Sequence, residues 1–296
     1  MSWNKDRIVE LLLEAGEIAR LAKKDLRREL KSDCSVVTQA DREIEAMLTS
    51  RLERPGDGVH IIGEETVDSK GDDYVRRALR DDAYVIDPID GTSPFSHYLP
   101  NWGVSIGWMR GGELRHGAVY LPEYREIVIS SERGDGTTMV EEGRLEDDLW
   151  TWRELPPLGV TRAGAAAGDV TGLVAITQAL AKRGRCDLRN PVMALGAAVV
   201  PLVGLLQGRF VAYLGSVRLW DAAGALPLIL AHGFSVTIEV DGQPQRVGAA
   251  VDDSSYVLSP GDPARWYFRS SLLICRTEDE ERMRRALIEE SRLDRE

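Results

Sequence analysis

The stretch YVIDPIDGTSPFSHYLP, residues 84–100, joins an apolar strand to a polar loop and indicates the centre of the fold. The apolar run stops at Asp87, and a second carboxylate, Asp90, follows three residues later. Gly91 and Thr92 come next, where the chain is expected to turn. Two carboxylates at the exit of a buried strand repel each other and are costly to desolvate. A hard divalent cation such as Mg²⁺ resolves that conflict because it prefers carboxylate and carbonyl oxygens.

The neighbours of the two acids extend this metal-site interpretation. The carbonyl of Ile89 is a further candidate ligand, and the amides of Gly91 and Thr92 would form an anion cradle if a helix starts there. Metal ligands beside an anion cradle indicate phosphate ester chemistry. The alternative is an ordinary turn, in which Asp90 and Gly91 supply the geometry and Asp87 caps a neighbouring element. The stretch by itself does not separate the two interpretations.

Other acids are weaker candidates when each is considered alone. Glu64 and Glu65 end the apolar stretch VHIIG, where one of them could turn toward a metal, although a solvated strand end is their ordinary role. Asp221 heads a predicted helix, and Asp41 lies in the first turn of another. A carboxylate in that position caps free N–H groups, so capping is the default role of both.

Composition and charge limit the function classes. The 296 residues include 37 basic and 48 acidic side chains, which gives a formal net charge of −11. Without a basic tract, this balance argues against nucleic acid or a membrane surface as partner. The three cysteines are scattered, which argues against a disulfide framework or a zinc site. The N-terminus is charged and lacks the apolar stretch of a signal peptide, so we expect a cytoplasmic protein.

Hydrophobic periodicity predicts the secondary structure. An amphipathic helix is expected near residues 8–26, and a second begins at Thr38 and Asp41, which resemble a capping box. A third, short helix starts near Asp72. Strands are predicted at residues 59–62, 83–87, 103–110, 113–121, 125–131 and 209–215, with a hairpin at 235–247. Further helices are predicted at residues 168–184, 194–208 (kinked or interrupted at Pro201), 219–233 and 277–293.

These elements predict an α+β fold with an antiparallel sheet in the N-terminal half and an α/β C-terminal half. Segment 132–168 is rich in Gly, Glu and Pro, and we expect it to hold loops and one edge strand. It is also the candidate boundary between halves. The domains predicted are residues 1–150, with most of the candidate metal ligands, and residues 151–296, which supply Asp221 and the specificity region.

The haloacid-dehalogenase type of phosphatase offers a competing interpretation of DPIDGT, because its nucleophile motif reads Asp-x-Asp-Gly-Thr. That mechanism needs two aspartates that are two residues apart. Asp87 and Asp90 are three apart, which moves the second carboxylate to the other phase of the strand, so we reject this interpretation. The sequence contains no P-loop motif.

The motifs IIGEE, VIDPIDGT and LWDAAGA, in this order, resemble the inositol monophosphatase family of lithium-sensitive, magnesium-dependent phosphatases. VVTQAD also matches the family's Val-Thr-x-x-Asp, and Lys31 lies near its preceding lysine. The resemblance extends from the first helix to about Gly233. It implies a layered αβαβα fold, a homodimer, and hydrolysis of a small phosphate monoester.

The resemblance also implies a set of metal ligands. A first Mg²⁺ would be held by Glu64, Asp87 and the carbonyl of Ile89. A second would be held by Asp87, Asp90 and Asp221, with Asp87 bridging the two ions. A third, weaker ion would contact Glu64 through water, and Li⁺ is the expected inhibitor. Two metal ions can activate water and stabilise a leaving alkoxide, so no histidine is required.

The catalytic and substrate-binding roles come from the same resemblance. Thr92, supported by Asp41, would join Glu64 in orienting and deprotonating the attacking water. The amides of Gly91 and Thr92 would bind phosphate oxygens. Asp41 retains two interpretations, capping and support of Thr92, which are compatible. Substrate contacts would lie at Asp90, Ala197 and Leu214.

Several positions depart from the family pattern. The family reads DGTxNF, whereas Pro94 here removes an amide side chain and a backbone donor. Gly196 stands in a run that normally carries a hydroxyl, and Leu214 replaces a glutamate that binds sugar hydroxyls. Because leucine cannot accept a hydrogen bond, myo-inositol monophosphate is not the expected best substrate. Histidinol phosphate, a nucleotide 3′-phosphate and a non-catalytic metal-binding role are alternatives, and Arg218 is either a contact to an acidic substituent or a surface charge.

Overall fold

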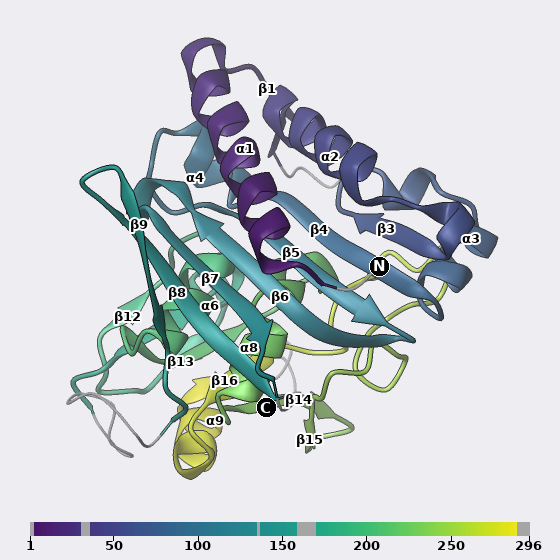
Figure 1. The fold of residues 1–296 in the computed structure, drawn as a ribbon. Coiled ribbons are helices and arrows are strands. Elements are labelled where there is room, and N and C mark those ends of the chain that lie inside the picture. The colour runs from purple at the N-terminus through teal and green to yellow at the C-terminus, as the bar shows by residue number, and fades with distance from the viewer. Residues whose placement is uncertain (1–2, 31–35, 135–136, 159–169, 289–296) are drawn as a thin grey trace.

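The computed structural model describes residues 3–30, 36–134, 137–158 and 170–288, and its elements stack in the order helix, sheet, helix, sheet, helix (Figure 1). This is the layered αβαβα arrangement that the family resemblance implied. The first helical layer is α1 (Lys5–Ala22) and α2 (Gln39–Leu52), the middle one is α6 (Val199–Leu206), α7 (Leu219–Ala223) and α8 (Leu226–Ala231), and the last is α5 (Gln178–Arg183) and α9 (Glu280–Ala286).

The first sheet has seven strands in the order β3-β4-β5-β6-β7-β8-β9. All neighbours are antiparallel except β3 and β4, which run parallel. Two strands, β8 and β9, occupy the segment in which loops and one edge strand were expected, so that prediction was incomplete. The predicted domain division after residue 150 falls within β9, and the division stays a prediction. The strands are β3 (Val59–Gly63), β4 (Asp82–Asp90), β5 (Gly103–Arg110), β6 (Glu113–Leu121), β7 (Glu126–Glu132), β8 (Thr138–Glu146) and β9 (Leu149–Glu154).

The second sheet has six strands in the order β12-β10-β13-β16-β14-β15. β13 pairs in parallel with β10 and antiparallel with β16, so this sheet is mixed. The hairpin of β14 and β15 turns at Asp241 and Gly242, both with positive φ, as predicted. The strands are β10 (Leu173–Ile176), β12 (Val192–Met193), β13 (Phe210–Gly215), β14 (Ser235–Val240), β15 (Gln243–Arg246) and β16 (Leu272–Cys275).

The helix predictions in the C-terminal half were wrong in detail, including the last one, because α9 ends at Ala286 and residues 287–288 form β17. Residues 173–176 form β10 rather than helix, because the short buried run pairs on both sides and only α5 after Thr177 is helical. Residues 194–198 precede α6, and Pro201 is the third residue of that helix. A first-turn N–H has no intrahelical partner, so Pro201 is accommodated without a kink. The helix predicted at 219–233 is divided into α7 and α8 at Gly224.

Short elements complete the chain. β1 and β2 pair antiparallel, β2 leads into α2, and α4 follows β4 (Figure 1). No helix of the described ranges is long and apolar enough to cross a membrane. The short elements are β1 (Arg28–Leu30), β2 (Val36–Thr38), α3 (Asp72–Ala78), α4 (Thr92–Ser96), β11 (Arg185–Cys186) and β17 (Leu287–Ile288).

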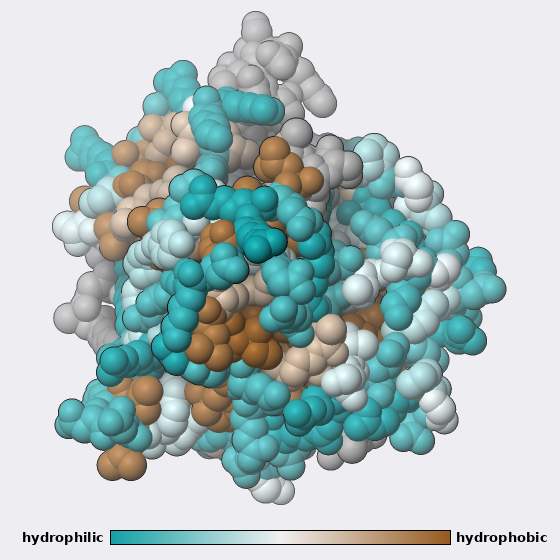
Figure 2. All heavy atoms as spheres, turned by 90° about the horizontal axis from the view of Figure 1, so that it is seen from above, coloured by the Kyte–Doolittle hydropathy of each residue, from teal (hydrophilic) through white to brown (hydrophobic). Residues whose placement is uncertain are grey.

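The surface near α4 carries several exposed apolar side chains among polar ones. Leu21, Leu30, Tyr98 and Leu99 are each more than 40% exposed, and they belong to α1, β1 and the segment after α4. Figure 2 views the molecule from above Figure 1 and shows apolar patches between polar residues on that face. This side of the molecule is therefore less uniformly polar than a net charge of −11 alone suggests.

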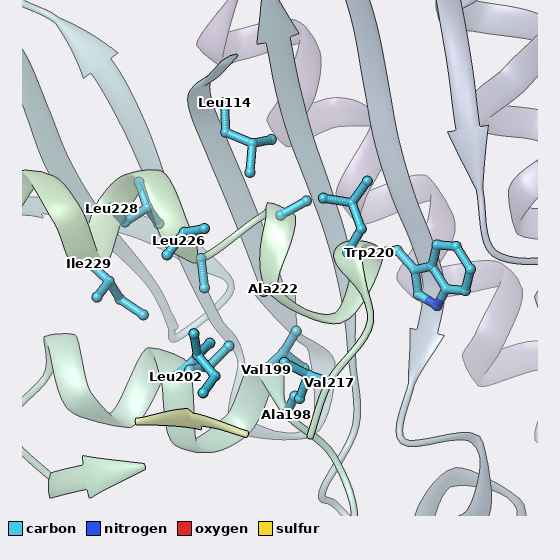
Figure 3. Packing of buried hydrophobic residues seen from close by; sticks show 14 of the residues in the cluster. Leu114, Ala198, Val199, Leu202, Val217, Trp220, Ala222, Leu226, Leu228 and Ile229 are labelled. Carbon is cyan, nitrogen blue, oxygen red and sulfur yellow. The ribbon is translucent and has the colours of Figure 1, made fainter. Parts of the chain in front are cut away.

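Each interface between layers is a hydrophobic core. One lies between α1, α2 and the first sheet, another between the two sheets, and a third between the second sheet and the outer helices, where Leu180 and Met283 are buried. Figure 3 shows Trp220 and Ala222 of α7 and Leu226 of α8 among the buried residues of the middle core. The middle layer is thus held between the sheets.

The end of α7 lies directly against the backbone of the first sheet because glycines face it. A Cβ on Gly107 would lie 2.7 Å from the Cβ of Ala223, and one on Gly117 would lie 2.2 Å from the carbonyl oxygen of Gly224. In return, a Cβ on Gly224 would lie 2.5 Å from Ser105 Oγ and 2.6 Å from the carbonyl oxygen of Ala118. This close approach fixes the position of α7, a short helix, and with it the position of Asp221.

We expect Gly224→Ala to destabilise the fold by about 2 kcal/mol, because the added methyl group overpacks a site closed by backbone atoms. It should also weaken Mg²⁺ binding, because α7 carries Asp221. Urea unfolding and calorimetric titration with Mg²⁺ measure the two effects. Gly248→Ala is the matched control, since a Cβ there meets nothing within 4 Å. Equal stability of the two variants would contradict the packing argument.

Candidate active site

An irregularity in β4 brings two carboxylates to the same side of the first sheet. Asp87 is paired with Ser105 and Asp90 with Gly103, so three residue steps on β4 match two on β5. Residues three apart in a regular strand face opposite sides. One extra residue cancels that alternation, so the expectation that Asp90 lies in the other phase of the strand was wrong. Pro88 lies in the irregular segment, where proline is tolerated in a sheet. We call this segment, Pro88 and Ile89, the β4 bulge.

Asp221 adds a third carboxylate from the start of α7. One oxygen each from Asp87, Asp90 and Asp221 lies within 4.8 Å of the others. Asp221 Oδ2 also accepts a hydrogen bond from the backbone N–H of Arg218 at 2.8 Å. The capping role expected of Asp221 therefore coexists with a place in this group, which we call the acidic cluster.

Asp90 connects the acidic cluster to the middle helical layer. Its Oδ2 accepts a hydrogen bond from the backbone N–H of Val199 at 2.5 Å, in the first turn of α6. An anionic group is stabilised there by the free N–H groups and the helix dipole. One oxygen of Asp90 is thus held by the C-terminal half of the chain, although the residue itself belongs to the N-terminal half.

Asp41 makes both types of contact expected of it. Its Oδ2 accepts hydrogen bonds from the backbone N–H of Thr38 at 2.8 Å and from the Thr38 hydroxyl at 2.6 Å, which caps α2. Its Oδ1 lies 3.2 Å from the hydroxyl of Thr92, which is also 3.1 Å from the carbonyl oxygen of Ile89. The threonine is therefore oriented from two sides.

Glu64 directly follows the end of β3 and is not one of the three acids of the acidic cluster. Its backbone N–H donates to the carbonyl of Ile86 on β4 at 3.2 Å. Its charge contributes to raising the pKa values of Asp41, Asp87 and Asp221. Glu64 is partly exposed, so it lies at the open side of the acidic cluster.

Gly91 makes the sharp turn between β4 and α4. Its φ of 88° lies in the left-handed region, where a side chain is strained. A Cβ would also lie 2.7 Å from both Ala197 Cβ and the carbonyl oxygen of Asn101. The turn therefore requires glycine, and it places Thr92 at the first position of α4, where the backbone N–H has no intrahelical partner.

A cavity of about 260 Å³ lies beside the acidic cluster. Ala197, for which a substrate contact is predicted, is one of its lining residues, and Asp90 and Asp221 form part of its wall. Leu214 is 7% exposed and packs in the core between the second sheet and the outer helices. The described lining residues are Asp90, Ile176, Thr177, Gln178, Ala179, Gly196, Ala197, Ala198, Tyr213, Ser216, Val217 and Asp221.

Tyr213 was missed by the sequence reasoning. It is 1% exposed and lines the cavity, and its Oη has no hydrogen-bond partner in the described structure. The residue precedes Leu214 on β13, so alternation along a strand places the two on opposite faces. The alternation of side chains along β13, rather than the family pattern, would have identified Tyr213 as a cavity residue.

Two of the positions that depart from the family pattern meet at the cavity. A Cβ on Gly196, which has a φ of 79°, would lie 3.0 Å from Pro94 Cγ and 3.0 Å from Gln178 Nε2. Pro94 is buried in α4.

The guanidinium of Arg218 lies 4.8 Å from the ring centroid of Tyr267, so an aromatic ring supports it. Lys31 lies outside the described residues.

Burial dominates the electrostatics of the acidic cluster. Desolvation, together with the other carboxylates, raises the pKa values of Asp87 and Asp90 well above their usual range. The same causes raise the pKa of Asp221 to about 7 and, against the hydrogen bonds from Thr38, that of Asp41 to about 6. Asp87 Oδ1 is buried without a hydrogen-bond partner in the described structure. Converging, unneutralised carboxylates of this kind fit a hard divalent cation.

The fold and the carboxylates at its strand ends are those of a metal-dependent phosphatase. More particularly, the chain belongs to the inositol monophosphatase family, whose family model matches residues 6–288. It is an inositol monophosphatase-like phosphoric monoester hydrolase. The inositol-1-monophosphatase of Rhizobium meliloti is 27% identical over 241 residues, which cover 79% of this chain and 84% of the relative.

Solved structures show the same fold. An IMPase of Thermotoga maritima has a TM-score of 0.67 at 18% identity, covering 95% of each chain. A staphylococcal inositol monophosphatase, solved as an inhibitory complex soaked in LiCl, has a TM-score of 0.66 at 14% identity, covering 96% of this chain and 95% of that one. At these identities the likeness concerns the fold alone.

The raised pKa values predict how the metal-free protein responds to pH. The pKa values of Asp221 and Asp41 in the folded state, about 7 and about 6, lie above the unfolded value of about 3.9. The folded state therefore binds more protons, and the stability from these protons is full below about pH 4 and lost as pH rises through about 6 to 7. Calorimetry in chelator should show a higher Tm at about pH 5.5 than at about pH 7.5. Saturating Mg²⁺ should reduce this difference, and a metal-free Tm that rises over the range would contradict the account.

Proposed function

We propose that this protein is a Mg²⁺-dependent phosphomonoesterase that hydrolyses a small phosphate monoester by direct attack of water. The observation that carries the proposal is the convergence of Asp87, Asp90 and Asp221 within 4.8 Å in a largely buried site beside a cavity. A buried acidic cluster without a neutralising cation is unfavourable on its own, which supports metal binding as its purpose.

The metal ligands proposed are those of the family resemblance. Asp87, Glu64 and the carbonyl of Ile89 would hold one Mg²⁺, and Asp87 with Asp90 and Asp221 would hold a second. Bound Mg²⁺ supplies a more acidic water and neutralises charge on the phosphate and the leaving oxygen. A third ion near Glu64, inhibition by Li⁺ and a homodimer belong to the same proposal.

Thr92 and Asp41 are proposed to prepare the attacking water. When the Thr92 hydroxyl donates to Asp41 Oδ1, its lone pairs are free to accept a hydrogen bond from water. Asp41, with a pKa of about 6, can accept a proton through Thr92 as the water attacks phosphorus. Glu64, at the open side of the acidic cluster, would orient the same water.

The amides of Gly91 and Thr92 are proposed to bind phosphate oxygens. The left-handed φ of Gly91 turns the chain directly into α4, so the free N–H groups of its first turn adjoin the acidic cluster. Phosphate would then lie between these amides and the carboxylates, with its leaving oxygen toward the cavity. Catalysis in this arrangement rests on positioning and charge stabilisation and needs no covalent intermediate.

The lining of the cavity favours an uncharged leaving group. Its polar side chains apart from the two aspartates are Thr177, Gln178, Tyr213 and Ser216, and no lysine, arginine or histidine occurs among the described lining residues. A nucleotide with a second phosphate would have no cationic partner there, so this alternative is disfavoured. Substrate contacts at Asp90 and Ala197 remain part of the proposal. Leu214 packs between the second sheet and the outer helices whereas Tyr213 lines the cavity, so we propose Tyr213 in its place.

Two alternatives remain for the experiment to separate. Histidinol phosphate, whose leaving group is an amino alcohol without a second phosphate, is the second candidate substrate. A non-catalytic metal-binding role would keep the acidic cluster without turnover. A phosphatase screen across polyol, sugar, amino-alcohol and nucleotide phosphates distinguishes these possibilities.

We expect Asp87→Asn and Asp221→Asn to lower kcat/KM by about 100-fold or more, because each removes a charged ligand from the site of phosphate activation. Phosphate release should also stop in chelator and return with Mg²⁺. Asp57→Asn, at an exposed residue far along the chain from the acidic cluster, is the control and should keep full activity. Turnover by the chelated protein would contradict the proposed function.

Tyr213→Phe should raise KM by about 2- to 10-fold for the best alcohol phosphate, because it removes one hydrogen-bond donor from the leaving-group cavity. The expected rise in KM is modest because a water molecule can replace the Tyr213 hydroxyl as hydrogen-bond partner of the substrate. Tyr256→Phe is the matched control, since Tyr256 is fully buried with an unpartnered Oη and packs against Phe268 away from the cavity. Similar kinetics of the two variants would exclude the Tyr213 hydroxyl from substrate recognition.

A further inference from the structure

A buried carboxylate on α2 lies behind the residues that present Glu64. Glu45 follows Asp41 by one helical turn and is 1% exposed. Its Oε2 accepts a hydrogen bond from the backbone N–H of Glu65 at 2.8 Å, and the Thr66 hydroxyl also bonds to this carboxylate. The Glu45 carboxylate therefore binds the two residues that directly follow Glu64.

The chain immediately before Glu64 is fitted to the same carboxylate. A Cβ on Gly63 would lie 2.4 Å from Glu45 Cδ and 2.5 Å and 2.7 Å from its two oxygens. The φ of Gly63 does not demand glycine, so the requirement is one of space. The turn of residues 63–66 is thus wrapped around the carboxylate, with Glu64 between its two points of contact.

This arrangement is costly as a purely structural device. A carboxylate is buried beside Glu64 and Glu65, which carry the same charge, and Glu45 Oε1 has no hydrogen-bond partner in the described structure. Desolvating a charged group and leaving one of its oxygens unpaired are both unfavourable. A neutral or apolar side chain of similar size would avoid both costs if the helix only needed to pack.

We propose that Glu45 is a positioning residue that holds the turn of residues 63–66 so that Glu64 faces Asp87. The inference rests on the proposed metal site but adds a residue outside the ligand set. It also gives α2 a second function at the site. Asp41 orients Thr92, and Glu45, four residues later, orients the turn that carries Glu64, so one helix aligns two sides of the same site.

The test compares Glu45→Ala, Glu45→Gln and the control Glu43→Gln, an exposed residue on the same helix. Mg²⁺ affinity is measured by calorimetry, independently of turnover, beside the Mg²⁺ activation constant of phosphate release and the Tm. We expect Glu45→Ala to weaken Mg²⁺ binding by about 10- to 100-fold, the usual effect of removing a group that orients a ligand. Glu45→Gln should restore most of the affinity, because its amide oxygen can accept from the N–H of Glu65. Glu43→Gln should match the wild type.

The outcomes separate this inference from the proposed function. A folded Glu45→Ala protein with wild-type Mg²⁺ affinity overturns the positioning role, even if its Tm is lowered. If Glu45→Ala does not fold, Thr66→Ala replaces it, with a few-fold loss of affinity expected; unchanged affinity there also overturns the inference. A wild-type protein that binds Mg²⁺ and releases no phosphate contradicts the proposed function instead, and the comparison of affinities still stands.

Discussion

Mutual repulsion among buried carboxylates is the constraint on which the rest of this structure depends. Asp87 and Asp90 come from β4, Asp221 from α7, and Asp41 adjoins them from α2. Asp90, Asp221 and Asp41 are each held by contacts that do not involve a metal, whereas Asp87 Oδ1 has no hydrogen-bond partner in the described structure. Asp90 accepts from the first turn of α6, Asp221 from the N–H of Arg218, and Asp41 from Thr38. Helix N-termini thus stabilise the charges that the site requires.

Sequence patterns indicated three acids that the structure brings together, and they were less accurate for the elements of the C-terminal half. The apolar strands from β5 to β7 and the capping box of α2 are local features, which the sequence records directly. The candidate acids could be located in the sequence because each one ends or begins a recognisable strand or helix. Residues 173–176 were mistaken for helix because a short apolar run has no period of its own, and their character as β10 comes from neighbours that are distant in the chain.

The residues that the sequence did not indicate act through tertiary proximity. Glu45 appears as one more polar residue on α2 until the turn after β3 is seen to surround it. Tyr213 is an ordinary strand residue until the cavity is located, and Leu214 was chosen from the family pattern rather than by its strand face. Gly107, Gly117 and Gly224 belong to separate motifs, and only packing shows that they meet. Such relations arise when layers are brought together, so no single segment records them.

The β4 bulge has a consequence for how this site can change in evolution. A substitution at Pro88 or Ile89 leaves the number of residues between Asp87 and Asp90 unaltered, so both acids keep their common side. Deleting or inserting one residue between Asp87 and Asp90 places the two acids on opposite sides of the sheet, even if every other side chain is preserved. The segment can therefore drift in composition while its length stays fixed. In distant relatives, spacing is consequently a more durable mark of this site than amino-acid identity.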